Sequence, residues 1–100
     1  MSARRQEYLE YLRSPAWRAT RQRYRDSRLP WRCHCCGETD GHLDLHHKTY
    51  KRFGRERLCD LVPLCRPCHI AVHDLVRHRG IGLWGATRVY RKRMGWRRRE

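Results

Sequence analysis

Four cysteines stand in two pairs whose spacing is typical of a zinc site. Cys33 and Cys36 are followed by Gly37, and Cys65 and Cys68 repeat the same spacing later in the chain. A Cys-x2-Cys turn lets two thiolates converge on one ion, and two such turns complete a tetrahedral shell. A closed shell leaves no open coordination position, so we expect a structural zinc ion.

Two further cysteines, Cys35 and Cys59, fall outside these pairs, and we expect both to be buried free thiols. Cys35 could replace Cys36 as a ligand, but the glycine after Cys36 permits the tight turn and favours Cys36. A rival site would join the first cysteine pair to His69 and His73, as in a small zinc finger. The interval is longer than in such fingers, and the second cysteine pair would have no ion.

Histidines form a second group. His69 and His73 are four apart in a helical pattern, so they share one face. His46 and His47 end an expected strand, where consecutive side chains point to opposite sides. One of them can therefore join His69 and His73 on a metal ion while the other faces a reaction centre. Three imidazoles leave positions for water and substrate, as in catalytic metal sites. The other histidines have no such partners, and we expect them at the surface: His34, His42 and His78.

Two helices are predicted before the first cysteine pair. The first covers residues 2–13 and the second residues 15–27. Ser14-Pro15 separates them, because serine can cap a helix and proline suits a first helical turn. Trp17 and Tyr24 lie seven apart on one face of the second helix, where we expect them to anchor it to the core.

Two strands and a third helix are predicted to carry the histidines. Residues 41–47 alternate as a strand, and residues 61–64 are a short apolar run. Pro63 makes this run an edge or distorted strand. A helical pattern covers residues 66–79, and Gly80 marks its end.

The order of these elements predicts a small α+β domain over residues 1–80. Residues 81–100 form a basic extension, with a short helix expected from Ala86 to Met94. Seven of the residues from Arg88 to Arg99 are basic. The extension is either a solvated tail or a phosphate-binding arm, and a solvated basic tail would still add nonspecific affinity.

Arginine dominates a strongly basic composition, and this predicts the class of partner. The 100 residues contain 24 Lys and Arg against 10 Asp and Glu, a formal charge of +14. A one-signed charge this large needs a polyanion, and nucleic acid is the expected one. No apolar run has the length of a signal peptide or membrane span. We therefore expect an intracellular, cytoplasmic protein without membrane contact, in which thiols stay reduced and bind metal.

Two segments carry a resemblance to a known family. The run LDLHH-x2-Y, and then GRERLCDLVPLCRPCHIAVH, resembles the HNH endonucleases, whose core is the ββα-metal or His-Me finger fold. The similarity covers roughly residues 11–73, because YLRSPAWRATRQRY before CHCCG resembles the family's lead-in. It implies that His46, His69 and His73 hold one divalent ion, Mg, Mn, Ni or Zn, and that His47 activates water.

The resemblance assigns less certain roles to two acidic residues, Asp60 and Glu56. Asp60 stands where the family often has asparagine, which pins the loop between the strands by hydrogen bonds. A carboxylate accepts such bonds but cannot donate them, so Asp60 either keeps part of this role or caps the loop. Glu56 falls where related sequences often have glutamate, and its partner is open between an arginine, a histidine beside the metal, and none.

The resemblance implies a nuclease that hydrolyses phosphodiester bonds of DNA with a metal ion. Arg66, Lys48 and Arg55 are candidates for holding a neighbouring phosphate. The alternatives are a zinc-stapled module that binds nucleic acid without cutting it, and a basic structural protein bound to RNA, which would leave both clusters unexplained. A protein partner or a second copy of so small a chain could be needed to cut both strands.

Overall fold

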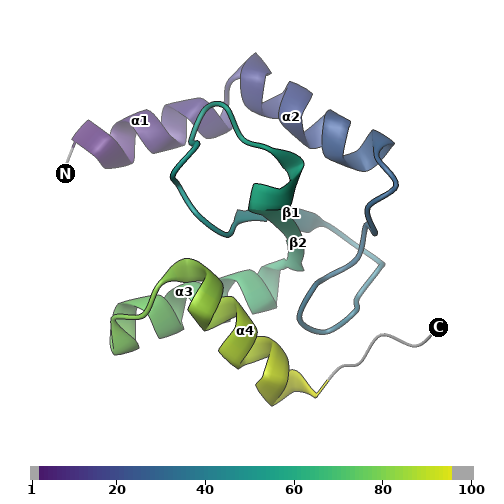
Figure 1. The fold of residues 1–100 in the computed structure, drawn as a ribbon, viewed down its shortest axis with the longest axis vertical. Coiled ribbons are helices and arrows are strands. Elements are labelled where there is room, and N and C mark those ends of the chain that lie inside the picture. The colour runs from purple at the N-terminus through teal and green to yellow at the C-terminus, as the bar shows by residue number, and fades with distance from the viewer. Residues whose placement is uncertain (1–2, 96–100) are drawn as a thin grey trace.

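The computed structural model describes residues 3–95, which form a small α+β fold (Figure 1). In chain order its elements are α1 (Ala3–Leu12), α2 (Pro15–Asp26), β1 (Leu43–His47), the 3-10 helix η1 (Leu58–Asp60), β2 (Leu61–Cys65), α3 (Arg66–Arg79) and α4 (Leu83–Met94). This confirms the predicted class. Within the described residues, no helix has both the length and the apolar character needed to cross a membrane.

The two N-terminal helices begin and end close to their predicted limits. The Ser14 side chain accepts a hydrogen bond from the Trp17 amide at 3.2 Å, and a proline opens α2. At the other end the Ser27 amide donates to the Tyr24 carbonyl, which closes the last turn. Trp17 and Tyr24 are buried and pack with Leu45 and Leu61, so both aromatic residues anchor α2 as expected.

The sheet consists of β1 and β2 in antiparallel register, with His46 opposite Val62 and His47 opposite Leu61. β1 starts at Leu43 rather than at residue 41, because Gly41 has a φ of 78°, outside the range of a strand. Pro63 lies on the outer edge of β2, as predicted.

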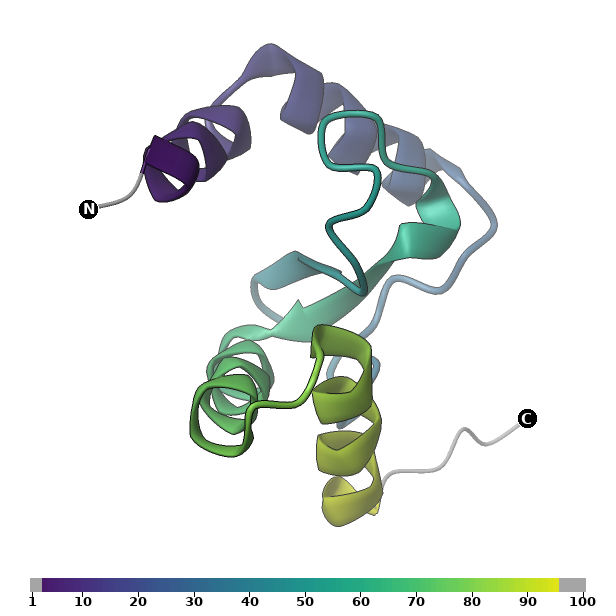
Figure 2. The ribbon, with the colours of Figure 1, turned by 60° about the vertical axis from the view of Figure 1, so that its left-hand side comes forward.

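The helices lie in two pairs on opposite sides of the sheet, α1 with α2 and α3 with α4 (Figure 2). Each pair covers its own hydrophobic core. Under α2 the core consists of Trp17, Tyr24, Leu45 and Leu61. Under α3 and α4 it consists of Cys33, Cys35, Leu43, Leu64, Cys68, Val72 and Ala86. β2 contributes Leu61 to the first core and Leu64 to the second, so it is enclosed by helices on both faces.

The extension predicted after residue 80 contributes to the core. α4 begins at Leu83, earlier than the expected Ala86, because Gly82 caps the helix. Ala86 and Thr87 are fully buried, and α4 packs along α3. The described part of the extension is therefore not a solvated tail. The remaining part of that prediction, including Arg97 to Arg99, lies outside the described residues.

Candidate metal centres and histidine site

The four paired cysteines converge in one cluster, and their sulfur atoms lie within 4.8 Å of one another. Cys36 Sγ is 3.7 Å from Cys65 Sγ, while Cys33 and Cys68 are buried behind them. Gly37 donates its amide to the Cys33 carbonyl and has a φ of 80°. Glycine adopts this conformation without a steric cost, which explains why the turn presents Cys36.

Electrostatics of this cluster call for a cation. Burial raises the pKa of Cys36 to about 11 and also raises the pKa of Cys68. Burial acts in the same direction on Cys33, but backbone hydrogen bonds, with Cys65 first, lower its pKa below the ordinary value. Four crowded thiols cannot all ionise without compensating charge. A divalent ion supplies that charge, and four sulfur donors fit zinc.

The two remaining cysteines are free thiols, but only Cys35 is buried as predicted. Cys35 is buried and its sulfur lies 3.8 Å from the Thr87 carbonyl, so it faces α4 and not the cluster. Burial raises the pKa of Cys35 to about 12, which keeps the thiol neutral. Cys59 is exposed, so its predicted burial was wrong, because it lies in the short helix η1 on the loop between the strands.

Three histidines form a second cluster, separate from the sulfur atoms. Ligand nitrogens of His46 from β1 and of His69 and His73 from α3 lie within 4.8 Å of one another. The ring centroids are 5.1 Å apart for His46 and His69, and 5.3 Å apart for His46 and His73. Burial, followed by the neighbouring His69, lowers the pKa of His46 to about 3 and also lowers that of His73. These two rings are therefore neutral near pH 7, as metal ligands must be.

Neighbouring side chains fix which nitrogen of two of these rings carries the proton. Asp44 Oδ2 lies 3.1 Å from His69 Nδ1, so Nδ1 donates and the Nε2 lone pair faces His73 Nε2 at 3.1 Å. Thr87 donates its hydroxyl proton to the Leu83 carbonyl at 2.7 Å, so it accepts from His46 Nε2 at 3.1 Å. This leaves a lone pair on His46 Nδ1. A set of three such imidazoles fits a divalent ion.

His47 points to the other side of β1, as alternation predicts, and is only 3% exposed. Its Nε2 lies 2.8 Å from Glu56 Oε2, and Glu56 Oε1 accepts a hydrogen bond from the Tyr11 hydroxyl at 2.6 Å. Burial acts to raise the pKa of Glu56, but these two bonds lower it. The ionised carboxylate therefore accepts a hydrogen bond from the Nε2–H group, and the free lone pair of His47 is on Nδ1.

Aromatic rings enclose His47. Trp17 stacks on it with ring centroids 5.0 Å apart and an interplanar angle of 19°. Tyr50 and Phe53, from the loop between the strands, lie at 5.3 and 5.7 Å, and Tyr8 of α1 lies at 6.4 Å. Desolvation in this enclosure lowers the pKa of His47. The sequence did not reveal this aromatic cage, because its members are far apart in the chain.

Asp60 fixes the loop between the strands. Its carboxylate accepts from Arg52 Nε at 2.9 Å, from Arg52 Nη2, and from the Arg57 amide at 3.0 Å. The Lys48 amide donates to the Asp60 carbonyl at 2.7 Å, which ties the two ends of the loop together. These partners all belong to the loop between the strands, so Asp60 holds this loop in place.

A cleft of about 300 Å³ lies beside the histidine cluster, and His69, Asp44 and Arg66 form one wall of it. Trp17, which stacks on His47, and Arg21 also line this cleft. Arg21 Nε is buried without a hydrogen-bond partner in the described part of the chain. The remaining lining residues are Tyr8, Leu12 and Leu45.

Of the three phosphate-binding candidates in the sequence, only Arg66 lies in this cleft. Lys48 lines a different pocket, and Arg55 is exposed on the loop between the strands. Arg21 was not singled out from the sequence, because the arginine-rich helix gives no sign of which side chain faces a cleft.

Comparisons with protein-family models, curated proteins and solved structures each found no match. The family likeness therefore stands on the residues of this chain alone. Its two quoted segments supply all seven members of the two clusters except Cys33 and Cys36, which lie in the CHCCG turn.

Proposed function

We propose that this chain is a metal-dependent endonuclease of the HNH type, with a ββα-metal core, that hydrolyses phosphodiester bonds of DNA. The observation that supports it most is the convergence of three imidazoles beside an arginine-lined cleft, separate from the sulfur cluster. Strand, strand and helix follow one another as β1, β2 and α3, in the order that this fold requires. The charge of +14 fits a polyanionic substrate.

Each cluster would hold one ion with a different purpose. Cys33, Cys36, Cys65 and Cys68 would hold structural zinc, which ties the CHCCG turn to the start of α3. His46, His69 and His73 would hold the catalytic divalent ion, which when bound supplies Lewis-acid stabilisation of charge on the phosphate. Asp44 and Thr87 orient two of these imidazoles and keep their lone pairs available.

His47 is the general base in this proposal. Glu56 accepts a hydrogen bond from the Nε2–H group of His47, and Tyr11 holds the carboxylate in place, so Nδ1 remains to take a proton from water. The same relation between an acid and an imidazole fixes the tautomer in hydrolytic triads. The aromatic cage keeps the imidazole neutral near pH 7, the state in which it can accept a proton.

Substrate access requires a movement. At 3% exposure His47 is closed to water in the structure, with Trp17 and Tyr8 over it. α1 covers the cage through Tyr8, which packs on Tyr50 and Phe53, so a displacement of α1 is the movement that would expose His47. Arg66 and Arg21 in the cleft are then suited to hold phosphate oxygens.

The burial of His47 also favours a second candidate function. A module that keeps His47 in a closed aromatic cage could bind nucleic acid without cutting it. Such a module would use the zinc and the arginines and leave the histidine cluster without chemistry.

A plasmid-nicking assay separates these functions. We expect zinc-loaded protein to nick supercoiled DNA with Mg, Mn, Ni or Zn added, and not without an added ion. His47→Ala should lower the rate by about 10²–10⁴-fold, the usual contribution of a general base. His78→Ala, an exposed histidine on α3, is the matched control and should cut at the normal rate. DNA binding with no cutting under any ion would favour the second candidate, and full activity of His47→Ala would remove His47 from the mechanism.

A further inference from the structure

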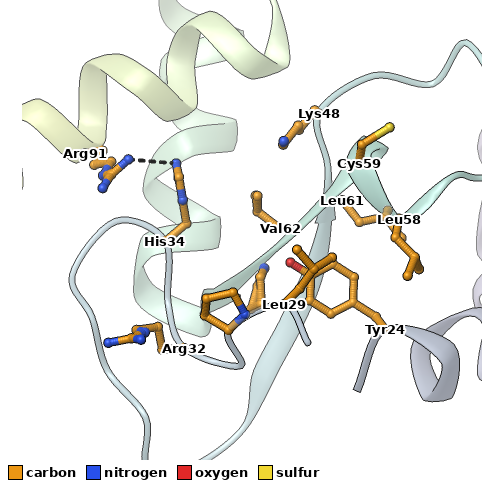
Figure 3. A pocket seen from close by; sticks show the side chains of 12 residues that line it. Tyr24, Leu29, Arg32, His34, Lys48, Leu58, Cys59, Leu61, Val62 and Arg91 are labelled. Atoms are coloured by element: carbon orange, nitrogen blue, oxygen red, sulfur yellow. Dashed lines mark hydrogen bonds between the residues drawn. The ribbon is translucent and has the colours of Figure 1, made fainter. Parts of the chain in front are cut away.

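A second pocket, of about 340 Å³, lies along β2 and has no part in the function proposed above (Figure 3). Its lining comes from the end of α2, the loop before the cysteine turn, both strand ends and α4. The lining residues are Tyr24, Leu29, Pro30, Arg32, His34, Lys48, Leu58, Cys59, Leu61, Val62, Pro63 and Arg91. The His34 amide donates to the Pro63 carbonyl at 2.8 Å, which fixes the loop against the strand and shapes one wall.

Three cations face this pocket, and no carboxylate is among its described lining residues. Arg32, Lys48 and Arg91 are all half-buried. Arg91 Nη1 donates to His34 Nε2 at 3.4 Å, so this imidazole is neutral and adds no compensating charge. Lys48 Nζ lies 4.6 Å from the ring centroid of Trp84, which holds the ammonium group at the rim. The pocket is therefore electropositive and suited to an anion.

The rest of the lining is apolar, which indicates more than a simple anion. Tyr24, Leu61 and Val62 form a wall, and Leu29 projects beside it with 43% of its surface exposed. Figure 3 shows Arg91 beside His34 at the left of the pocket and Lys48 at the upper right. A ligand with one flat apolar part and one negatively charged part would meet both kinds of surface. A nucleotide has this composition, and the volume is at the lower end of the range for small-molecule pockets, about 300–1,000 Å³.

The pocket adjoins the histidine cluster. Val62 lines the pocket and lies opposite His46 in the sheet register, a separation of about 5 Å between Cα atoms. Lys48 follows His46 by two residues, about 7 Å along an extended chain. A nucleic-acid strand advances about 3.4 Å for each nucleotide, so a strand at the histidines reaches this pocket within a few nucleotides.

We propose that this pocket binds one unstacked nucleotide of a nucleic-acid strand, with its base against Leu29 and Val62 and its phosphate between Lys48 and Arg91. The site would position the strand next to the histidine cluster, and it gives α4 a part in substrate binding. The inference rests on the proposed function only in taking nucleic acid as the ligand, since binding at the pocket requires no cleavage and no ion at the histidines.

The test is a titration of zinc-loaded, ¹⁵N-labelled protein, monitored by NMR, with no other metal ion added. Three probes are compared: dCMP, deoxycytidine and inorganic phosphate. We expect dCMP to bind tighter than either fragment and to shift the indole signal of Trp84, which lies under Lys48. Equal affinity for phosphate and dCMP would overturn the contact with the base, and shifts confined to other surfaces would overturn the site.

Variants in matched pairs distinguish binding at this pocket from attraction of the ligand to the net positive charge of the protein. Lys48→Gln and Arg91→Gln should each weaken dCMP binding by about tenfold, whereas Arg93→Gln, on the exposed side of α4, should not. Leu29→Ala should weaken binding of dCMP but not of phosphate, and Leu9→Ala on α1 is its control. Equal losses in Arg91→Gln and Arg93→Gln would reduce the effect to net charge and overturn the proposal. Because no arm measures cutting, an inactive nuclease with an intact pocket would be recognised as such.

Discussion

The sulfur cluster and the histidine cluster share helix α3 but differ in every property that decides what a metal site can do. Cys68 and His69 are consecutive residues, yet one faces a core of buried thiols and the other lines a cleft. The sulfur cluster has four donors, two of which are buried, while the histidine cluster has three donors and a cleft with arginines beside it. Consecutive residues on a helix point about 100° apart, so one helix can serve a closed site and an open one.

The outer contacts of the two clusters differ as well. Backbone amides contact the sulfur of Cys33, so the fold of the turn itself tunes the thiol. The histidines depend instead on side chains from distant segments, with Asp44 beside His69 and Thr87 beside His46. We infer that metal binding at the sulfur cluster stabilises the fold, whereas metal binding at the histidine cluster depends on the side chains that orient the imidazoles.

Loss of one sulfur ligand should have the largest effect. Cys68→Ser leaves three thiolates in a buried cluster, and structural zinc contributes about 10–16 kcal/mol to folding in small zinc domains. We expect the cooperative thermal unfolding transition, measured by circular dichroism, to be lost. Cys59→Ser, at an exposed free thiol, should unfold like the unchanged protein. A Cys68→Ser protein with an unaltered melting curve would contradict a folding role for the cluster.

Glu56→Gln should have the next largest effect, on catalysis alone. An amide keeps the shape of the carboxylate but presents a donor as well as an acceptor, so the tautomer of His47 is no longer fixed. We expect kcat for DNA cleavage to fall at least about tenfold with KM and metal affinity unchanged. Glu38→Gln, on the exposed turn after the first cysteine pair, is the matched control. A change in KM alone would place Glu56 in substrate binding instead.

Thr87→Val should weaken metal binding at the histidines. Valine has nearly the same shape but cannot accept the proton of His46 Nε2, so the ring loses its orientation. Outer contacts of this kind affect metal affinity by about 10–100-fold, and we expect the lower end because Asp44 still holds His69. Calorimetric titration of zinc-loaded protein with Mn²⁺ measures it. Unchanged affinity would show that α4 only packs against the site.

Asp60→Ala should have the smallest effect on the two clusters and the clearest on the loop between the strands. It removes the acceptor for Arg52 and for the Arg57 amide. We expect faster tryptic cleavage after Arg52 and Arg55, with Mn²⁺ affinity unchanged. Asp26→Ala on α2 controls for the loss of a surface carboxylate. A large loss of metal affinity would give Asp60 a direct part in the histidine site.

Features set by a few consecutive residues were predictable from the sequence. The turn at Gly37, the cap at Ser14 and the end of α3 at Gly80 follow from local backbone chemistry. The pairing of His69 with His73 follows from helical spacing alone. These rules act over one turn of chain and need no knowledge of the fold.

Contacts between distant segments were not predictable. Tyr11 and Glu56 are 45 residues apart, and His46 and Thr87 are 41 apart, so no periodicity links them. The sequence left the partner of Glu56 open, and the structure gives it His47 on the face opposite the histidine cluster. The burial of His47 also depends on how α1 folds over the sheet, which only the assembled structure reveals.

The central claim is that sulfur and imidazole ligands belong to separate centres, and a cobalt titration tests it most directly. We expect the first equivalent of Co²⁺ to give intense sulfur-to-metal charge-transfer bands of a four-thiolate site. The second equivalent should bind with no further sulfur bands, and His73→Ala should abolish only this second step. A single bound ion whose spectrum changes on substitution of both Cys68 and His73 would contradict the account.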